Sequence, residues 1–180
     1  ALVRCDPTRD ERACGLLQMS HTTPTDILYS SYWYRSGTNN TMRAHLRGIA
    51  EEAAAMVGKS NARVLDIGCN DGTLLKAFPT ASDRVGIDPS DIVLELMADG
   101  ANNGISVVHD LFPSSELEAA SLGRPFDIIT AIAMFYDLED PLAFVRQVKA
   151  LLARDGLWVF EMSYMPTMLQ MNSYDTICHE

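Results

Sequence analysis

The sequence predicts an α/β fold in which helices cover both faces of a doubly wound, mostly parallel sheet. Short apolar strands alternate with helical patterns from residue 63 onward. The strands are nearly continuous in apolar residues, as in parallel strands that are buried on both faces. A loop with two glycines joins the first strand to a helix. Such sheets bind ligands at the carboxyl ends of their strands, so we expect sites in the loops after residues 67, 87, 109 and 133.

The N-terminal part of the chain has two regions. Residues 1–38 look irregular, with no sustained helical period. A helix is expected over residues 41–57, because Asn39, Asn40 and Thr41 offer capping oxygens at its start. Its apolar positions form one stripe and end before Gly58: Met42, Leu46, Ile49, Ala53 and Met56.

The remaining elements follow in alternation. Strands are expected over residues 64–68, 84–88, 105–109, 126–133 and 157–162. One helix is expected over residues 72–78, and a second is expected to start at Pro89, whose fixed φ suits a helix start. Asp140 can cap a third helix that begins at Pro141. Asp155 and Gly156 are expected to turn the chain into the last strand.

Composition excludes several functional classes. The chain has 180 residues, with 14 Lys and Arg against 24 Asp and Glu, a net charge of −10. A nucleic-acid partner is not expected, because counterion release needs a basic surface. No membrane span is expected, since the longest apolar run, residues 128–136, is under half of the roughly 20 residues required. Four scattered cysteines indicate a reduced, cytoplasmic protein.

The segment from Val64 to Leu75 carries the strongest functional signal. An apolar strand leads into a loop with glycines at positions 68 and 72, where the backbone can approach a ligand closely. Asp88 ends the second strand and can accept hydrogen bonds from ribose hydroxyls. Asp71 inside the loop would repel a pyrophosphate, which disfavours a nicotinamide dinucleotide. A cationic nucleoside such as S-adenosylmethionine fits this charge better.

The run from Val64 to Met162 resembles the class I S-adenosylmethionine-dependent methyltransferases, whose core is Rossmann-like. The resemblance implies a set of cofactor-binding residues at the strand ends. Gly68, Asn70 and Gly72 would line the methionine and ribose side, Asp88 would hold the ribose, Asp110 and Leu111 would flank the adenine, and Ala133, Met134 and Phe135 would close the pocket. Asp110 could instead cap a helix ahead of Pro113, and Met134 and Phe135 could be core residues.

The flanking segments resemble a narrower family, the C-methyltransferases that act on nucleotide-linked keto-deoxysugars. Cys5 and Cys14 look like the second half of a small zinc module whose other cysteines lie upstream. The run from Tyr174 to Glu180 is similar to the family's substrate-site segment. The resemblance implies that residues 1–38 are the remnant of a zinc-binding, substrate-contacting module and that residues 39–180 are the methyltransferase core. It also implies a piece of a longer protein whose sheet lacks its last two strands.

The same resemblance implies catalytic residues. Carbon methylation needs a base that forms an enolate, so His179 is a candidate with Glu180 as its partner, although the residue after Glu180 could be the base instead. Tyr32 could donate a hydrogen bond to the enolate oxygen. Asp137 stands where many of these enzymes have a histidine, which leaves the sugar and the product configuration open. The other histidines, at positions 21, 45 and 109, are read as ordinary structural residues.

The sequence therefore predicts an enzyme that moves a methyl group from S-adenosylmethionine to a carbon, C3, of a nucleotide-linked 4-keto-deoxysugar. Two alternatives stay open. One is methylation of an oxygen or nitrogen on another small metabolite. The other is a non-catalytic domain that binds a nucleoside or serves assembly.

Overall fold

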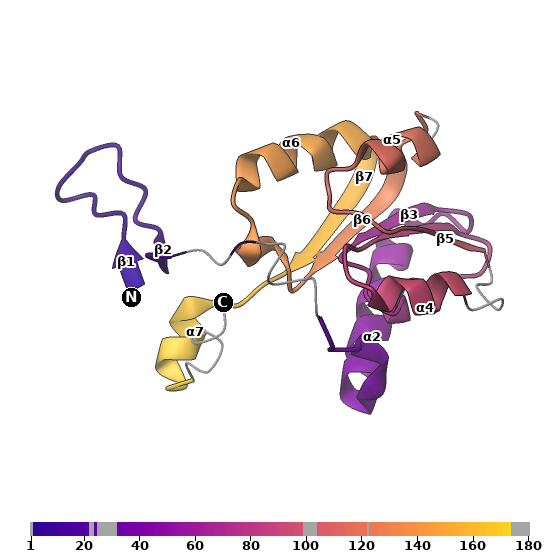
Figure 1. Cartoon of the computed structure of the whole chain (residues 1–180), viewed down its shortest axis with the longest axis horizontal. Helices are drawn as coiled ribbons and strands as arrows, with labels where there is room; N and C mark the ends of the chain where they lie inside the picture. The colour runs from indigo at the N-terminus through magenta and orange to yellow at the C-terminus, as the bar shows by residue number, and fades with distance from the viewer. Residues whose placement is uncertain (1, 22–23, 25–31, 99–103, 122, 174–180) are drawn as a thin grey trace.

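The computed structural model describes residues 2–21, 24, 32–98, 104–121 and 123–173. Its centre is a sheet with the strand order β5-β4-β3-β6-β7, in which every neighbouring pair is parallel (Figure 1). The strands are β3 (Arg63–Ile67), β4 (Asp83–Ile87), β5 (Ile105–Val108), β6 (Phe126–Ile132) and β7 (Leu152–Glu161). The predicted α/β fold class is confirmed. That two further strands belong to this sheet stays a prediction.

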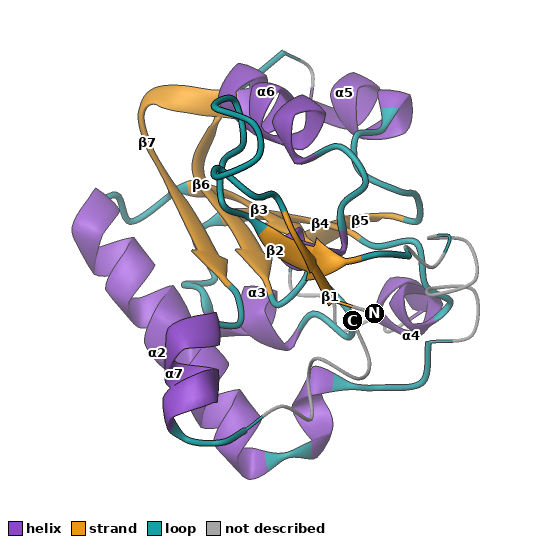
Figure 2. Cartoon of the chain, turned by 90° about the vertical axis from the view of Figure 1, so that its left-hand side faces the viewer, coloured by secondary structure: helices purple, strands orange, loops and turns teal. Residues whose placement is uncertain are grey.

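Helices cover the sheet in two layers (Figure 2). One face carries α2 (Asn40–Val57), α3 (Thr73–Ala77) and α4 (Ile92–Ala98), and the other carries α5 (Ser115–Ser121) and α6 (Pro141–Leu151). No helix within the described ranges is long and apolar enough to cross a membrane.

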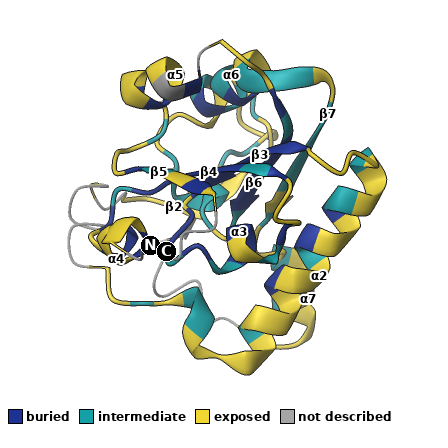
Figure 3. Cartoon of the chain, turned by 90° about the vertical axis from the view of Figure 1, so that its right-hand side faces the viewer, coloured by how far each residue is buried: buried dark blue, intermediate teal, exposed yellow. Residues whose placement is uncertain are grey.

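The central strand β3 shows why the layers form. Val64 packs with Leu46 of α2, whereas Leu65 belongs to the cluster that holds Phe144 of α6. All five residues of β3 are buried, and the buried positions gather along the sheet between the helical layers (Figure 3). Alternate side chains of one strand therefore supply both hydrophobic cores.

Two predicted helix caps are confirmed. The Asn39 side chain accepts a hydrogen bond from the Thr41 amide at 2.7 Å at the start of α2. Asp140 accepts one from the Ala143 amide at 2.9 Å at the start of α6, with Pro141 in the first turn. These side chains satisfy amides that have no partner within the helix.

Two predicted element boundaries were wrong. Helix α4 begins at Ile92 rather than at Pro89, because Ser90 is held by its own bonds to the Asp88 carboxylate. Asp155 and Gly156 lie inside β7, which shows a register irregularity against β6. A Cβ on Gly156 would meet the Phe126 carbonyl at 3.0 Å, so this glycine permits close approach of the two strands. Helix α5 was expected only in the alternative in which Asp110 caps a helix.

The first 38 residues contain regular structure, contrary to the expectation. Strands β1 (Leu2–Arg4) and β2 (Leu17–Met19) pair as an antiparallel hairpin, which stands off to one side of the sheet (Figure 1). Short helical segments complete the described chain: η1 (Ser36–Thr38), η2 (Phe135–Asp137) and α7 (Met165–Gln170).

We expect Phe144→Ala to lower the free energy of unfolding by about 3–5 kcal/mol, because the side chain is 2% exposed and packs edge-on against Phe112. Denaturant unfolding measures this change. Leu142→Ala is the matched control on the same helix, since Leu142 is 65% exposed, and it should change stability by less than about 0.5 kcal/mol. Equal effects of the two substitutions would contradict the assignment of this core.

Candidate active site

A cavity of about 660 Å³ opens at the carboxyl ends of the strands. The loops after β3, β4, β5 and β6 contribute to its wall, and Glu161 at the end of β7 borders it on one side. The strand order reverses between β3 and β6, where sheets of this kind bind their ligands. The sequence-predicted residues that line the cavity are Tyr32, Gly68, Asn70, Asp88, Asp110, Leu111, Ala133 and Met134.

The loop after β3 is shaped by its two glycines. Gly68 has a φ of +76°, and its amide donates to the Ile87 carbonyl at 2.8 Å. Gly72 has a φ of +71°, and a Cβ there would meet a methyl carbon of Leu96 at 2.7 Å. Gly72 does not line the cavity, because it forms the N-cap of α3 and packs against α4 instead. Its placement therefore supports the loop rather than a direct contact with a ligand.

The Asp88 carboxylate is held firmly at the cavity wall. Oδ2 accepts the Asn70 amide at 2.8 Å, and Oδ1 accepts both the amide and the hydroxyl of Ser90, at 2.8 and 2.5 Å. A carboxylate can accept about four hydrogen bonds, so the described contacts leave room for roughly one more. The expected bonds to both ribose hydroxyls would need one present contact to give way.

Asp110 begins the loop after β5. Its Oδ1 accepts the Leu111 amide at 2.8 Å, and its Oδ2 accepts the Ser114 hydroxyl at 2.6 Å. Ser114 in turn accepts the Leu117 amide at 3.2 Å, near the start of α5. Asp110 therefore supports the capping residue of α5 and also lines the cavity, so the two readings of this residue are compatible.

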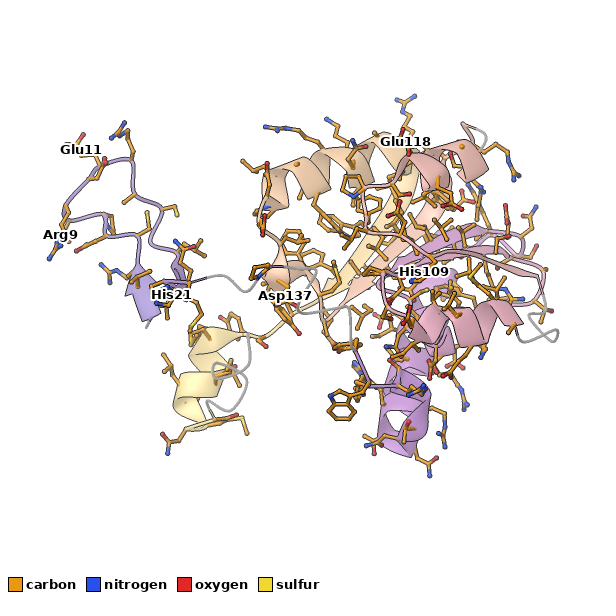
Figure 4. The ribbon with its side chains drawn as sticks, viewed as in Figure 1. Arg9, Glu11, His21, His109, Glu118 and Asp137 are labelled. Carbon is orange, nitrogen blue, oxygen red and sulfur yellow. The ribbon has the colours of Figure 1, made fainter. Side chains whose placement is uncertain are left out.

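The segment after β6 divides between the cavity and the core. Ala133 has a φ of +54°, and it lines the cavity together with Met134. Phe135 does not line it, because its ring packs 5.7 Å from those of Phe144 and Trp158. Phe135 is half-buried and packs against the hydrophobic cluster, so the structure favours the core alternative, and closure of the pocket by this residue stays a prediction. Asp137 lines the cavity, on the side nearer the N-terminal hairpin in Figure 4.

Residues 32–38, which we call the strap, lie across the glycine loop. The Asn70 side-chain amide donates to the Tyr34 carbonyl at 2.9 Å, and its Oδ1 accepts the Ser36 amide at 3.0 Å. The Gly37 amide donates to Oδ2 of Asp71 at 2.8 Å. Asp71 therefore faces the strap and does not line the cavity. This differs from the expectation that its carboxylate faces the ligand and repels a pyrophosphate.

The strap is also tied to α4. Arg35 forms an ion pair with Glu95, and the pKa of the Glu95 carboxyl is lowered mainly by its hydrogen bond to Arg35. Tyr32, the first residue of the strap, lines the cavity, and its side chain is 42% exposed. The cavity is therefore bordered by an aromatic segment that is fastened to the glycine loop.

Asp66 lies in the segment that carries the strongest functional signal, but no role was predicted for it from the sequence. It lies within β3, is 3% exposed and lines the cavity. Thr130 of β6 donates its hydroxyl to Oδ1 of Asp66 at 2.7 Å. Burial raises the pKa of the Asp66 carboxyl to about 7, and the charge of nearby Asp88 adds to the rise. A bound cation would favour the ionised form of this acid.

The two N-terminal cysteines lie together on the hairpin and are not joined by a disulfide. The pKa of the Cys14 thiol is lowered mainly by the Leu16 backbone amide and next by the Cys5 side chain. Amide donors of this kind suit a thiolate metal ligand. Within the described part of the chain, however, no three or more potential ligands come together, whereas a structural zinc site needs four.

The two catalytic residues expected from the tail, His179 and Glu180, lie outside the described residues. A different acid and histidine meet at the cavity. Glu161 of β7 lies 2.7 Å from Nε2 of His45 in α2, although the sequence reading treated His45 as structural. The one available signal was a polar residue, Glu161, at the end of a largely apolar strand.

Comparison with known families identifies the core. The family described as "Methyltransferase domain" matches residues 39–180. The chain belongs to this family. The core is therefore that of a methyltransferase that depends on S-adenosylmethionine, and the cavity at the strand ends is the candidate site for this donor. Its acidic wall, with Asp66 and Asp88 buried, fits a donor that carries positive charge.

Individual relatives agree with this family. The chain is 28% identical over 173 residues to the C-methyltransferase NovU of Streptomyces niveus. This alignment covers 94% of the chain and 40% of NovU. It is 36% identical over 114 residues to a ubiquinone biosynthesis O-methyltransferase of Bordetella parapertussis, covering 62% of this chain and 45% of that enzyme. The chain therefore spans less than half the length of these curated relatives.

A solved structure shows the same fold. The plantazolicin methyltransferase BpumL, in complex with a triazolic desmethylPZN analog and SAH, matches with a TM-score of 0.58 and 18% identity. The match covers 76% of this chain and 53% of BpumL.

We expect Gly37→Ala to weaken binding of S-adenosylmethionine to this methyltransferase about tenfold, measured as Kd by calorimetry. A Cβ would meet Oδ2 of Asp71 at 2.7 Å and the Thr73 hydroxyl at 2.8 Å, so the strap must leave the loop. Gly48→Ala is the control, because nothing lies within 4 Å of its Cβ position in α2. That substitution should leave Kd unchanged and stabilise the helix by up to about 1 kcal/mol. An unchanged Kd in Gly37→Ala would show that the strap is irrelevant to the donor.

Asp66 should make the stability of the methyltransferase fall as pH rises from about 4 to 7. Over that range the unfolded carboxyl ionises while the buried one, with a pKa of about 7, keeps its proton. The free energy of unfolding of the wild type, relative to Asp66→Asn, should therefore drop by a few kcal/mol between pH 4 and pH 7.5, at roughly 1.4 kcal/mol per unit of pKa difference.

Denaturant unfolding at several pH values measures this change. Glu52→Gln, at an exposed position of α2, is the control for the removal of a carboxylate. A flat difference for Asp66→Asn would mean that Asp66 is ionised in the folded protein.

Proposed function

We propose that the protein transfers the methyl group of S-adenosylmethionine to a carbon, C3, of a nucleotide-linked 4-keto-deoxysugar. The observation that carries this proposal is the extent of the match to a C-methyltransferase. That alignment takes in 94% of the chain and so includes most of the segments flanking the core. The O-methyltransferase match covers 62%. The flanking segments are where the sequence resembles the keto-sugar enzymes.

Under this proposal, residues after different strands contact different parts of the donor. Asp88, over β4, would hold the ribose, and Asp110 and Leu111, over β5, would flank the adenine. Gly68 and Asn70, after β3, would border the methionine part. Bound there, the donor supplies a methyl group on a positively charged sulfur. Ala133 and Met134, after β6, would then separate the donor from the acceptor.

Carbon methylation starts with loss of a proton beside the ketone. The Tyr32 hydroxyl at the cavity wall would donate a hydrogen bond to the developing enolate oxygen. By the family resemblance, His179 with Glu180, or the residue after Glu180, is a candidate base for this step. Asp137, where related enzymes have a histidine, would border the acceptor and affect which sugar is accepted.

We also propose a role for residues 1–38 as a zinc-binding module of a cytoplasmic enzyme. Cys5 and Cys14 would supply two thiolates, and the other two would come from outside this sequence. Zinc in that module would hold the hairpin together and take no part in methyl transfer. Metal analysis of the intact protein, with a Cys5→Ser and Cys14→Ser double variant, tests this assignment. An equal zinc content in both proteins would refute it.

A second candidate function is methylation of an oxygen on another small metabolite. It is favoured by the 36% identity of the core to ubiquinone biosynthesis O-methyltransferases. The two functions differ in the atom that receives the methyl group, so one product analysis separates them.

The test is incubation of the intact protein with ¹³C-methyl S-adenosylmethionine and a thymidine-diphosphate-linked 4-keto-6-deoxyhexose. We expect an NMR signal from a methyl group bonded to a ring carbon. Asp88→Ala should lower kcat/KM by about a hundredfold, because it removes the ribose carboxylate (about 2.7 kcal/mol). Asp91→Ala is the matched control and should retain wild-type activity.

Two results would count against the proposal. A methyl signal on oxygen or nitrogen would favour the second candidate function. Donor binding without transfer to either a keto-sugar or a catechol would indicate a non-catalytic domain.

A further inference from the structure

The carboxylate of Glu161 and the imidazole of His45 form a pair across the cavity wall. Oε2 of Glu161 lies 2.7 Å from Nε2 of His45, and the side chains are 43% and 45% exposed. The two residues are 116 positions apart, so only the fold brings them together. Glu161 lines the cavity, whereas His45 supports it from α2.

The sheet order puts this pair at the acceptor side. A donor whose nucleoside part lies over β4 and β5 and whose methionine part lies over β3 presents its reactive end toward β6 and β7. Glu161 is the last residue of β7, and its carbonyl accepts the Ala133 amide at 2.9 Å. This bond fixes the backbone of Glu161 to the loop that borders the donor.

Stability gives little reason for the pair. Exposed ion pairs contribute between 0 and about 1 kcal/mol, because water screens both groups. Positioned carboxylates, in contrast, act as bases toward protons beside ketones in other enzymes. An imidazole N–H donated to one carboxylate oxygen orients the group and leaves the second oxygen available to a ligand.

We propose that Glu161 is the catalytic base of the methyl transfer and that His45 is its positioning residue. This rests on the proposed function. The C–H bond beside the ketone breaks, its proton bonds to a carboxylate oxygen of Glu161, and its electron pair forms the enolate. The enolate carbon then bonds to the methyl group, and the electrons of the broken C–S bond stay on sulfur as a neutral thioether. Glu161 finally releases its proton to water.

Proton removal can be measured apart from methyl transfer. The intact protein is incubated in D₂O with S-adenosylhomocysteine and the same keto-deoxyhexose nucleotide, and deuterium entering C3 is followed by NMR. Glu161→Gln should slow this exchange by about a hundredfold or more, since the amide cannot take a proton. It should leave donor Kd and the unfolding midpoint unchanged, because the side chain is half-exposed.

His45 should act through Glu161. His45→Ala should lower the exchange rate about tenfold, mainly in kcat, and His45→Gln should recover part of it because its amide N–H can also donate. Glu52→Gln is the control, since this exposed glutamate lies on the same helix and away from the cavity. His179→Ala tests the competing base.

The outcomes separate the two proposals. Exchange at the wild-type rate in Glu161→Gln, with loss only in His179→Ala, overturns the assignment of Glu161 and leaves the function standing. Absence of exchange in the wild type, with transfer to a catechol, overturns carbon methylation. If Glu161→Gln then also loses transfer to the catechol, the assignment of Glu161 as base is kept. If the variant retains that transfer, the assignment is overturned. A wild type that acts on neither probe overturns both proposals.

Discussion

The burial of β3 on both faces is the constraint on which the rest of this structure depends. Every residue from Arg63 to Ile67 is buried, so its apolar side chains must pack into the helical layers above and below. Most of the polar residues that line the cavity therefore lie at or after the ends of the strands. Asp66 is an acid within the strand. It accepts a hydrogen bond from the Thr130 hydroxyl, and burial raises its pKa, which favours the uncharged form. Gly68, which follows β3 directly, therefore lies at the cavity wall.

Asn70 connects the parts of the site that the sheet alone does not hold together. Its backbone amide binds Asp88, while its side chain binds the strap at Tyr34 and Ser36. The residue assigned to the ribose and the segment that carries Tyr32 therefore share one support. A substitution in the glycine loop should affect both the donor and the acceptor sides, because the contacts pass through a single residue.

The order of strands separates two chemical environments within one cavity. Asp88 and Asp110 lie over the early strands, where a nucleoside fits, and Glu161 lies over the late ones. The match to a C-methyltransferase extends beyond the core, whereas the match to O-methyltransferases does not. The two matches therefore differ in the flanking segments.

The sequence alone determined the fold class, the glycine loop and the place of Asp88, because these depend on local periodicity and on fixed spacing between consecutive elements. It also located the helix caps, which are local hydrogen bonds. Only the tertiary structure decided that Phe135 packs into the core while its neighbours line the cavity, and that Asp71 faces the strap. It alone paired His45 with Glu161. Such contacts join residues far apart in the chain, and the packing of whole elements sets them.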